Sequence, residues 1–355
     1  MIFEKFSALL AEMISTKVPD LHIASGIYPH IRKHDGEIHA VEEFGPVSAS
    51  DVRAILVEML GSEKFKHFEM TGDADFSYSY GEHRFRVNAS ADAYGHSLAL
   101  RAIPTEIPSC ETLQIPPALI KLLDRGKGLI LVTGPTGSGK STTLASMIDY
   151  INQTYRRHII TIEDPIEFNF RNKQCLIHQR EIGSHTQSFS RAMRASLRED
   201  PDVIMVGEMR DPETIAAAMT LAETGHMVLS TLHTNDSVQS VDRIIDSFPT
   251  EQQNQIRTQL AMSLTAILSQ ILIPKKDTQG RVAARELLIN NDAVRSVIMQ
   301  GATHRLYGVL ELYAQEGMFL MDQYLERLFM NGQITKDTLL SRVRDPDLVA
   351  HIAAK

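Results

Sequence analysis

One segment of this sequence has the residue types and the spacing needed to hold a polyphosphate. Residues 134–141 read Gly-Pro-Thr-Gly-Ser-Gly-Lys-Ser, which satisfies the pattern G-x-x-x-x-G-K-[ST]. In such a loop the glycines let successive backbone N–H groups turn inward around a phosphate. Lys140 reaches the β- and γ-phosphate oxygens, and the Ser141 hydroxyl can bind Mg²⁺. The alternative interpretation is a glycine-rich turn with an exposed lysine.

The surroundings of this loop favour nucleotide binding over a simple turn. An apolar run at 128–133 precedes it and a helical pattern at 140–152 follows it, which is the strand–loop–helix context that the mechanism requires. No N-K-x-D segment that would read guanine follows, so ATP is favoured over GTP. The predicted nucleotide-binding residues are Gly134, Pro135, Thr136, Gly137, Ser138, Gly139, Lys140, Ser141 and Thr142.

Hydrolysis also needs a carboxylate near the γ-phosphate to orient or deprotonate water. The apolar run 203–206 ends in Gly207-Glu208, where many P-loop enzymes have an Asp for the Mg²⁺ shell followed by a Glu. Glu208 is therefore the predicted catalytic base. Because glycine replaces the Asp, we expect metal binding to depend on Ser141, water and a second acid.

A neighbouring apolar run supplies a candidate for that second acid. Residues 159–162 lead into Glu163-Asp164-Pro165. We predict that Glu163 takes part in catalysis and, with Ser141, holds Mg²⁺. The alternative is that these residues form only a capped turn.

Two histidines flank a further apolar run at 227–232. His233 follows the run, at the end where parallel strands place their ligand-binding residues, and is the predicted sensor of the γ-phosphate. His226 precedes the run, so we expect it to be a hydrogen-bonded structural residue.

A parallel α/β sheet must position these side chains. From residue 121 onward, short apolar runs alternate with helical patterns, which is typical of a parallel sheet with helices on both faces and ligands at the carboxyl ends of its strands. The helix after 203–206 should begin with Asp211 as N-cap and Pro212 at its first position, and Gly225 should follow its end.

The length of 355 residues predicts two domains, since one domain usually has about 150 residues. Before residue 101 a helical pattern at 51–60 precedes alternating extended patterns at 75–80 and 83–89, which indicates an α+β unit. A proline-rich stretch follows, and after about residue 291 the pattern is helical. The predicted boundaries are 1–102 for the N-terminal domain, 103–118 for a linker, 119–290 for the nucleotide-binding core and 291–355 for a C-terminal helical region.

Composition excludes several classes of function. The net charge of −8, from 36 basic and 44 acidic residues, leaves no general positive field to hold nucleic acid, so direct nucleic-acid binding is not expected. The two cysteines, Cys110 and Cys175, cannot form a four-thiolate zinc site or a disulfide framework, so no zinc is expected. No apolar run approaches the roughly 18 residues of a membrane span, so membrane association is expected through a partner.

The ordered set of motifs resembles that of secretion and type IV pilus motor ATPases, and most closely the bacterial ATPases that retract pili in twitching motility. Besides the phosphate loop, the resemblance rests on motifs spread along nearly the whole chain. They are Asp20-Leu21-His22, residues 84–88 and 101–104, the acidic box 160–168, the atypical Walker B segment 197–211 and the histidine box 222–234.

This resemblance implies a fold, an assembly and roles for the motif residues. The fold is an N-terminal PAS-like α+β domain followed by a RecA-like P-loop ATPase domain with C-terminal helices, and six identical chains form a ring. Glu208 matches the family's catalytic glutamate, Glu163 and Asp164 match its acidic box, and His226 and His233 match its histidine box.

The family also brings arginines from the first domain onto the phosphates. By motif position Arg86 and Arg101 are the best matches and Arg84 is a further candidate; the alternative is that they are surface charges. The implied partners are an inner-membrane pilus platform protein and, in some systems, a paralogous motor ATPase. The implied location is the cytoplasm, with peripheral attachment to the inner membrane through the pilus machine.

The predicted function is therefore a hexameric, ATP-hydrolysing motor that drives type IV pilus retraction. Two alternatives stay open: an accessory retraction-ATPase paralogue with little turnover of its own, and a related secretion or DNA-uptake motor. The family's C-terminal A-I-R-N-L-I-R-E segment corresponds to residues 293–300, where Met299 and Gln300 replace the second arginine and the glutamate.

Overall fold

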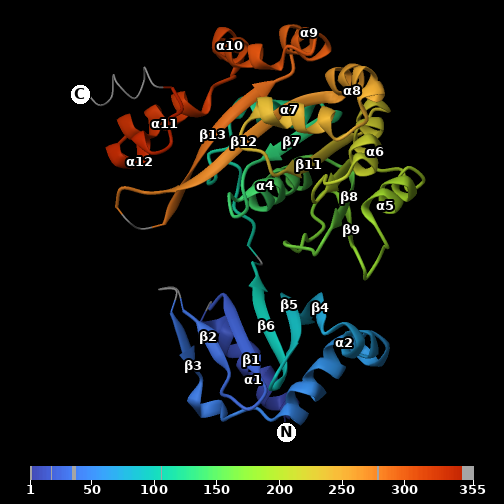
Figure 1. Ribbon diagram of the computed structural model, residues 1–355, viewed down its shortest axis with the longest axis vertical. Coiled ribbons are helices and arrows are strands. Elements are labelled where there is room, and N and C mark those ends of the chain that lie inside the picture. Colours follow the sequence, from blue (N-terminus) through green and yellow to red (C-terminus); the bar gives the residue numbers. More distant parts are fainter. Residues whose placement is uncertain (1, 17, 34–36, 105, 278–279, 346–355) are drawn as a thin grey trace. The chain divides into compact units, whose positions relative to one another are not determined.

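The computed structural model describes residues 2–16, 18–33, 37–104, 106–277 and 280–345. The chain divides into two compact units (Figure 1). Unit 1 comprises Met1–Glu106 and Pro165–Asn169, and unit 2 comprises Ile107–Asp164 and Phe170–Lys355. Within the described residues, no helix is long and apolar enough to cross a membrane.

Unit 1 is an antiparallel sheet packed against helices. Its six strands are ordered β3-β2-β1-β6-β5-β4. The strands are β1 Asp20–Ala24, β2 His30–Arg32, β3 Ile38–Ala40, β4 Asp73–Tyr80, β5 His83–Asp92 and β6 Gly95–Ile103; the helices are α1 Ile2–Ser15, η1 Glu42–Phe44 and α2 Ala49–Thr71. The core between sheet and helices includes Leu10, Leu56, Phe68 and Phe85, all almost fully buried.

The expected helix over 51–60 is present but forms only the first part of α2. Ser48 caps it by accepting a hydrogen bond from the backbone N–H of Asp51. The first segment ends at Gly61, whose φ of 73° is non-helical, and the chain then continues as a second helical segment to Thr71. The strand patterns at 75–80 and 83–89 are confirmed within β4 and β5.

Unit 2 is built on a mostly parallel sheet of seven strands, ordered β13-β12-β7-β11-β10-β8-β9. The strands are β7 Gly128–Thr133, β8 His158–Glu163, β9 Leu176–Glu181, β10 Val203–Val206, β11 Met227–Leu232, β12 Leu264–Pro274 and β13 Arg281–Ile289. All neighbours pair in parallel except β12 and β13, which form an antiparallel hairpin. The predicted strands at 128–133, 159–162, 203–206 and 227–232 are confirmed.

Helices surround this sheet and continue beyond it to form the C-terminal region. They are α3 Pro117–Asp124, α4 Lys140–Thr154, α5 Phe189–Ser196, α6 Pro212–Glu223, α7 Ser237–Asp246, α8 Thr250–Ser263, α9 Asp292–Met299, α10 Leu306–Leu312, α11 Met321–Met330 and α12 Lys336–Leu340, with 3₁₀ turns η2 Thr303–Arg305 and η3 Ala314–Glu316. A single core joins strand residues such as Leu131, Ile204 and Val228 to residues of α5 through α10.

The predicted start and end of α6 are also confirmed. Asp211 accepts a hydrogen bond from the N–H of Thr214 at 2.8 Å, Pro212 is the first helical residue, and Gly225 follows with a φ of 103°. The fold class expected from the sequence, an α+β unit followed by a parallel-sheet core with C-terminal helices, is confirmed. The β12–β13 hairpin was not among the predicted elements.

Candidate active site

Four neighbouring parallel strands end at the same edge of the unit 2 sheet. The register pairs Thr133 of β7 with Leu232 of β11, and Val206 of β10 with both Ser230 of β11 and Ile162 of β8. The phosphate loop, His233, Glu208 and Glu163 each lie at the carboxyl end of one of these strands. The sheet thus brings together candidates that are up to 99 residues apart in the sequence, because parallel strands end on the same side.

The phosphate loop connects β7 to α4 in a tight turn. Gly134 has a φ of 148°, and a Cβ on it would lie 2.1 Å from the carbonyl oxygen of Gln270, so only glycine fits there. The Lys140 side chain is buried and its Nζ donates hydrogen bonds to the carbonyl oxygens of Gly134 at 2.8 Å and Pro135 at 3.0 Å. The ammonium group therefore lies across the mouth of its own loop.

Side chains of strand β12 hold this loop and the strand before it through hydrogen bonds. The Gln270 side chain donates to the carbonyl oxygen of Ser138 at 2.7 Å and accepts from the Thr143 hydroxyl at 3.0 Å. One strand position earlier, the Ser269 hydroxyl lies 2.8 Å from the hydroxyl of Thr133. The hairpin that the sequence patterns missed is therefore what holds the phosphate loop in shape.

The loop also has an unsatisfied polar group suited to a phosphate oxygen. Ser138 is 3% exposed, and its hydroxyl has no hydrogen-bond partner among the described residues. A buried hydroxyl without a partner costs free energy unless a ligand supplies one. This hydroxyl, in a loop of glycines, fits an anionic ligand with several oxygen acceptors.

Glu208 is held by two neighbouring side chains. Its Oε2 lies 3.3 Å from Nε2 of His233, and its Oε1 lies 2.5 Å from a guanidinium nitrogen of Arg210. The Glu208 side chain is 15% exposed, whereas those of His233 and Arg210 are 47% and 75% exposed. Arg210 was not among the predicted site residues, although its position two residues after Glu208 could have indicated it.

The backbone before Glu208 is fixed by both neighbouring strands. The N–H of Gly207 donates to the carbonyl oxygen of Ile162 at 2.8 Å, and its carbonyl oxygen accepts from the Thr231 hydroxyl at 2.7 Å. A Cβ at position 207 would lie 3.4 Å from the Ile162 oxygen, a near-normal contact. Space alone therefore does not require glycine there.

Glu163 ends β8 beside this segment and is buried, at 6% exposure. Its Oε1 accepts hydrogen bonds from the Thr161 hydroxyl at 2.6 Å and from the Gln179 side chain at 3.2 Å. Both donors are neutral side chains, and they orient the carboxylate. Asp164, the next residue, is exposed.

His226 lies at the starting end of β11, the opposite edge of the sheet from the phosphate loop. Its Nδ1 is 3.1 Å from both the Thr224 hydroxyl and the carbonyl oxygen of Leu221. These contacts close the last turn of α6 and agree with the structural role expected for this histidine.

The arginine candidates lie in unit 1, next to one another on neighbouring strands. Arg86 of β5 is paired in register with Arg101 of β6, which in turn is paired with Asp20 of β1. Arg101 donates to both carboxylate oxygens of Asp20, at 2.6 and 3.3 Å, and hydrogen bonding to Asp20 raises the pKa of Arg101. Arg86 is exposed, and Arg84 donates to the Ser77 hydroxyl at 2.7 Å.

A cavity of about 780 Å³ adjoins the phosphate loop within unit 2. Its walls include Gln114 from the segment before α3, Thr142 at the start of α4, and Arg281 and Arg285 from β13. Arg285 is 2% exposed and donates to the carbonyl oxygen of Gln114 at 3.1 Å, and burial lowers its pKa. The cavity is large enough for a nucleoside and opens beside the loop that would hold the phosphates.

Comparisons with known proteins agree with this geometry. Residues 70–333 match the family model described as "Type II/IV secretion system protein". The chain is 42% identical over 340 residues to the "Type IV pilus retractation ATPase PilT" of Pseudomonas aeruginosa, covering 96% of this chain and 98% of that one. It is 38% identical over 338 residues to the "Type IV pilus ATPase PilU" of the same organism, covering 95% and 88%.

A solved structure is similar over nearly its entire length. The crystal structure described as "the Pilus Retraction Motor PilT and Bound ADP" has a TM-score of 0.90 and 44% sequence identity to this chain, covering 97% of this chain and 98% of that one.

Proposed function

This chain belongs to the type II/IV secretion system protein family and is a nucleotide-using ATPase, and on that basis we propose that it is the motor that retracts a type IV pilus. The observation that carries the proposal is the convergence of Glu208, His233 and the phosphate loop at one edge of the sheet. The likeness of this chain to PilT, a protein named as a pilus retraction ATPase, favours retraction over assembly of the pilus.

In this proposal ATP places its phosphates on the backbone amides of residues 134–141. Lys140 exchanges the carbonyl oxygens of Gly134 and Pro135 for the β- and γ-phosphate oxygens, and the Ser138 hydroxyl gains the acceptor that it lacks. The nucleoside occupies the adjoining cavity, beside Thr142. Binding thus gives the Ser138 hydroxyl a hydrogen-bond partner and gives Lys140 charged acceptors in place of neutral ones.

Glu208 then acts as general base toward a water molecule that attacks the γ-phosphorus. To do so its carboxylate turns away from Arg210, because a guanidinium hydrogen bond occupies the oxygen that would receive the proton. His233, in contact with the other oxygen, orients the carboxylate and approaches the γ-phosphate. The proton passes to Glu208 as the bond to the leaving ADP breaks.

The residues present also fit a Mg²⁺ ion. The Ser141 hydroxyl at the start of α4 and the buried, oriented carboxylate of Glu163 are oxygen ligands of the kind that Mg²⁺ prefers. When bound, the ion supplies positive charge to the β- and γ-phosphate oxygens.

Arg86 and Arg101 complete the proposed site by approaching the phosphates when the motor closes. Arginine supplied from outside the nucleotide-binding core makes turnover depend on closure, and such a contact contributes about 10³-fold or more to the rate. Arg86 is exposed and can take this role directly. Arg101 forms an ion pair with Asp20, so it would have to give up part of that contact to bind the phosphates. A head-to-tail ring of six chains would repeat the closure around the ring.

The proposed partner is the inner-membrane platform protein of the pilus, with the motor on its cytoplasmic side and with no direct contact to nucleic acid. The test is a chromosomal deletion complemented with the native gene or with Glu208→Gln. Surplus surface pili together with lost twitching, restored only by the native gene, are expected. Cells without pili would instead mean that the protein assembles the filament.

A second candidate function is that of an accessory ATPase with little turnover of its own. It is favoured by the 38% identity to PilU and by the replacement of the family's arginine and glutamate by Met299 and Gln300 at the end of α9. The turnover number of the isolated chain separates the two, because an accessory protein would hydrolyse ATP only in the presence of a principal motor. The related secretion or DNA-uptake motor is separated by the deletion phenotype.

A further inference from the structure

A buried carboxylate begins the helix that follows the histidine box. Only four residues, 233–236, connect the end of β11 to the start of α7. The last of them, Asp236, is fully buried and caps α7 by accepting a hydrogen bond from the N–H of Gln239 at 2.7 Å. His233, the contact of Glu208, is the first of these four residues. The position of Asp236 therefore limits where His233 can lie.

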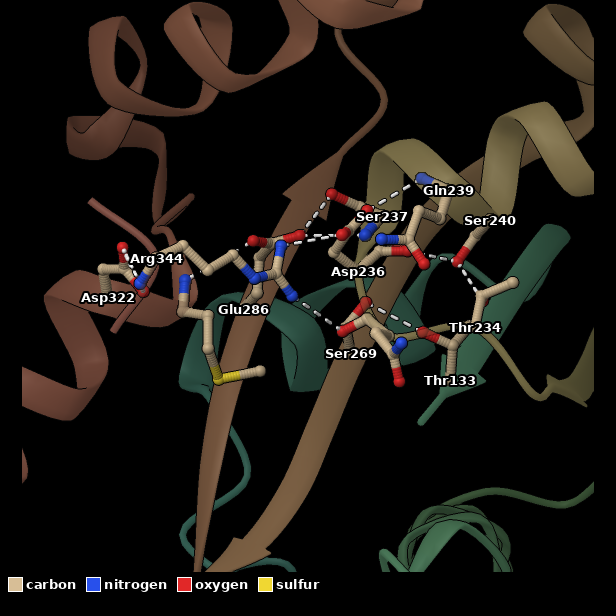
Figure 2. Close-up of polar contacts among 12 residues, drawn as sticks. Thr133, Thr234, Asp236, Ser237, Gln239, Ser240, Ser269, Glu286, Asp322 and Arg344 are labelled. Atoms are coloured by element: carbon tan, nitrogen blue, oxygen red, sulfur yellow. Dashed lines mark hydrogen bonds and ion pairs between the residues drawn. The ribbon is translucent and has the colours of Figure 1, made fainter. Parts of the chain in front are cut away.

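The counter-charge for this carboxylate comes from the other end of the chain. Arg344, which lies after α12, donates to Oδ2 of Asp236 at 2.7 Å (Figure 2). It also donates to the carbonyl oxygen of Asn235 at 3.5 Å. The two residues of the ion pair are 108 positions apart. The contact thus joins the C-terminal segment directly to the loop that carries His233.

A second acid makes this counter-charge important. Glu286 of β13 is 1% exposed and accepts hydrogen bonds from the N–H and the hydroxyl of Ser237, at 2.9 and 2.5 Å (Figure 2). Two buried carboxylates therefore lie at the start of α7. Burial, followed by the charge of Asp236, raises the pKa of Tyr307 to about 12. Without Arg344 the Asp236 carboxylate would be buried with no cation from the described part of the chain in contact with it, which is strongly unfavourable.

The segment that carries Arg344 is itself anchored. The backbone N–H groups of Arg344 and Asp345 donate to the carboxylate of Asp322, in the first turn of α11, at distances from 2.9 to 3.2 Å. Val343 packs against the small core formed by α11, α12 and the β12–β13 hairpin. The backbone that carries the Arg344 guanidinium is thus held in place by hydrogen bonds and apolar packing.

We propose that Arg344 is a positioning residue for ATP hydrolysis, which clamps Asp236 and thereby holds His233 against Glu208. The inference rests on the proposed function of that site, and it adds a coupling between the C-terminal helical region and the catalytic carboxylate. A partner that moved the segment after α12 away from Asp322 would loosen His233 without touching the nucleotide.

The experiment compares Arg344→Ala, Arg344→Lys and a matched control in the full-length protein. The control is Arg342→Ala, an exposed arginine two residues earlier in the same segment. We expect Arg344→Ala to lower kcat about tenfold, the size of effect typical for residues coupled through one network, with KM for ATP changed less than about twofold. Arg344→Lys should recover part of kcat, because it keeps the charge but has one nitrogen in place of the two that contact Asp236 and Asn235. Arg342→Ala should match the native protein.

A double-variant cycle shows whether Arg344 acts through His233. In a His233→Ala background, Arg344→Ala should cause no further loss of kcat, because the side chain that it positions is gone. The inference would be overturned if the fold-loss of kcat in the double variant equalled the product of the two single-variant losses. It would also be overturned if Arg344→Ala had native kcat. Including Glu208→Gln keeps the two proposals separate: native turnover of Glu208→Gln refutes the site, whereas an inactive Glu208→Gln with a normal Arg344→Ala refutes only the clamp.

Hydrogen exchange gives a second readout that does not depend on turnover. Amides of residues 233–241, including the N–H of Gln239 that Asp236 accepts, should exchange about tenfold faster in Arg344→Ala, while amides of β7 and α4 keep their native protection. Unchanged exchange at 233–241 would contradict the clamp. Uniformly faster exchange would likewise contradict it, since a general loss of stability would then explain the variant.

Discussion

Nε2 of His233 lies 3.3 Å from Oε2 of Glu208, although the two residues follow different strands of the sheet. The parallel pairing of β10 with β11 creates this contact, because Val206 and Ser230 are in register and both strands run toward the same edge. The two side chains form one unit, in which the histidine orients the carboxylate. Arg210 contacts the remaining carboxylate oxygen, so both oxygens of Glu208 have a partner.

Lys140→Ala should weaken ATP binding, because it removes the ammonium group that we propose to contact the β- and γ-phosphates. A hydrogen bond to a charged group contributes about 1.5–3 kcal/mol, which corresponds to a loss of affinity of roughly 10- to 150-fold. Calorimetric titration of the nucleotide measures it. Lys121→Ala, which removes an exposed lysine of α3, is the matched control and should bind ATP normally. Native affinity in Lys140→Ala would place the phosphates elsewhere.

Alanine substitutions at two glycines should have opposite outcomes. Gly134→Ala places a Cβ 2.1 Å from the carbonyl oxygen of Gln270, so the loop must shift, and we expect ATP binding to be lost and stability to fall by about 1–3 kcal/mol. Gly207→Ala meets nothing closer than 3.4 Å and should fold with near-native stability. Thermal unfolding of both variants measures the difference. Equal loss of stability would show that the close approach of β12 is not what selects glycine in the loop.

Alanine substitutions of Arg86 and Arg101 should have different effects on the free energy of unfolding but similar effects on kcat. Arg101→Ala leaves the poorly exposed Asp20 without its partner and should lower the free energy of unfolding by about 1 kcal/mol, whereas Arg86→Ala should leave it unchanged. Both should lower kcat strongly if they reach the phosphates, by about 10³-fold for an arginine of this kind.

Asp20→Asn is the control for this pair, because it disturbs the same contact but keeps both arginines. It should lose some stability and retain most of the turnover. If Arg86→Ala and Arg101→Ala hydrolyse ATP at the native rate, the arginines are surface charges.

Glu286→Gln should change how stability depends on pH. Burial raises the pKa of Glu286, even though hydrogen bonds from Ser237 act in the opposite direction. Because the folded pKa lies above the unfolded value of about 4.3, the contribution of this carboxyl to stability is present below that value and is lost as pH rises through the folded pKa. The difference in unfolding free energy between variant and native protein should therefore move in favour of the variant from pH 4 to pH 7.5.

Denaturant unfolding at the two pH values measures this difference. Glu311→Gln, at an exposed position of α10, is the control and should show the same difference at both. A pH-independent difference for Glu286→Gln would mean that the carboxyl titrates alike in the folded and unfolded chain.

The sequence was sufficient to predict that the candidate residues lie together at one edge of the sheet, because their placement follows from local pattern and strand polarity. The glycine pattern of residues 134–141 predicts a tight turn, and Glu208, Glu163 and His233 each follow an apolar run. Once the runs are strands of one parallel sheet, their ends must meet. No knowledge of distant contacts is required for that step.

The remaining features depend on pairings between distant residues that carry no local signal. The β12–β13 hairpin supports the phosphate loop through Gln270, which lies 127 positions from its partner Thr143. Arg101 meets Asp20 across 81 positions, and Arg344 meets Asp236 across 108. In each case the residue type is ordinary for a protein surface, and only the fold shows that it has a partner.

The central claim is that Glu208 is the base of an ATPase whose phosphates lie on the loop 134–141. The most direct measurement is ATP turnover and ATP affinity of purified Glu208→Gln beside the native protein. The account predicts native affinity with turnover reduced by about 10²- to 10⁴-fold, the usual contribution of a general base. Turnover of Glu208→Gln at the native rate would contradict it.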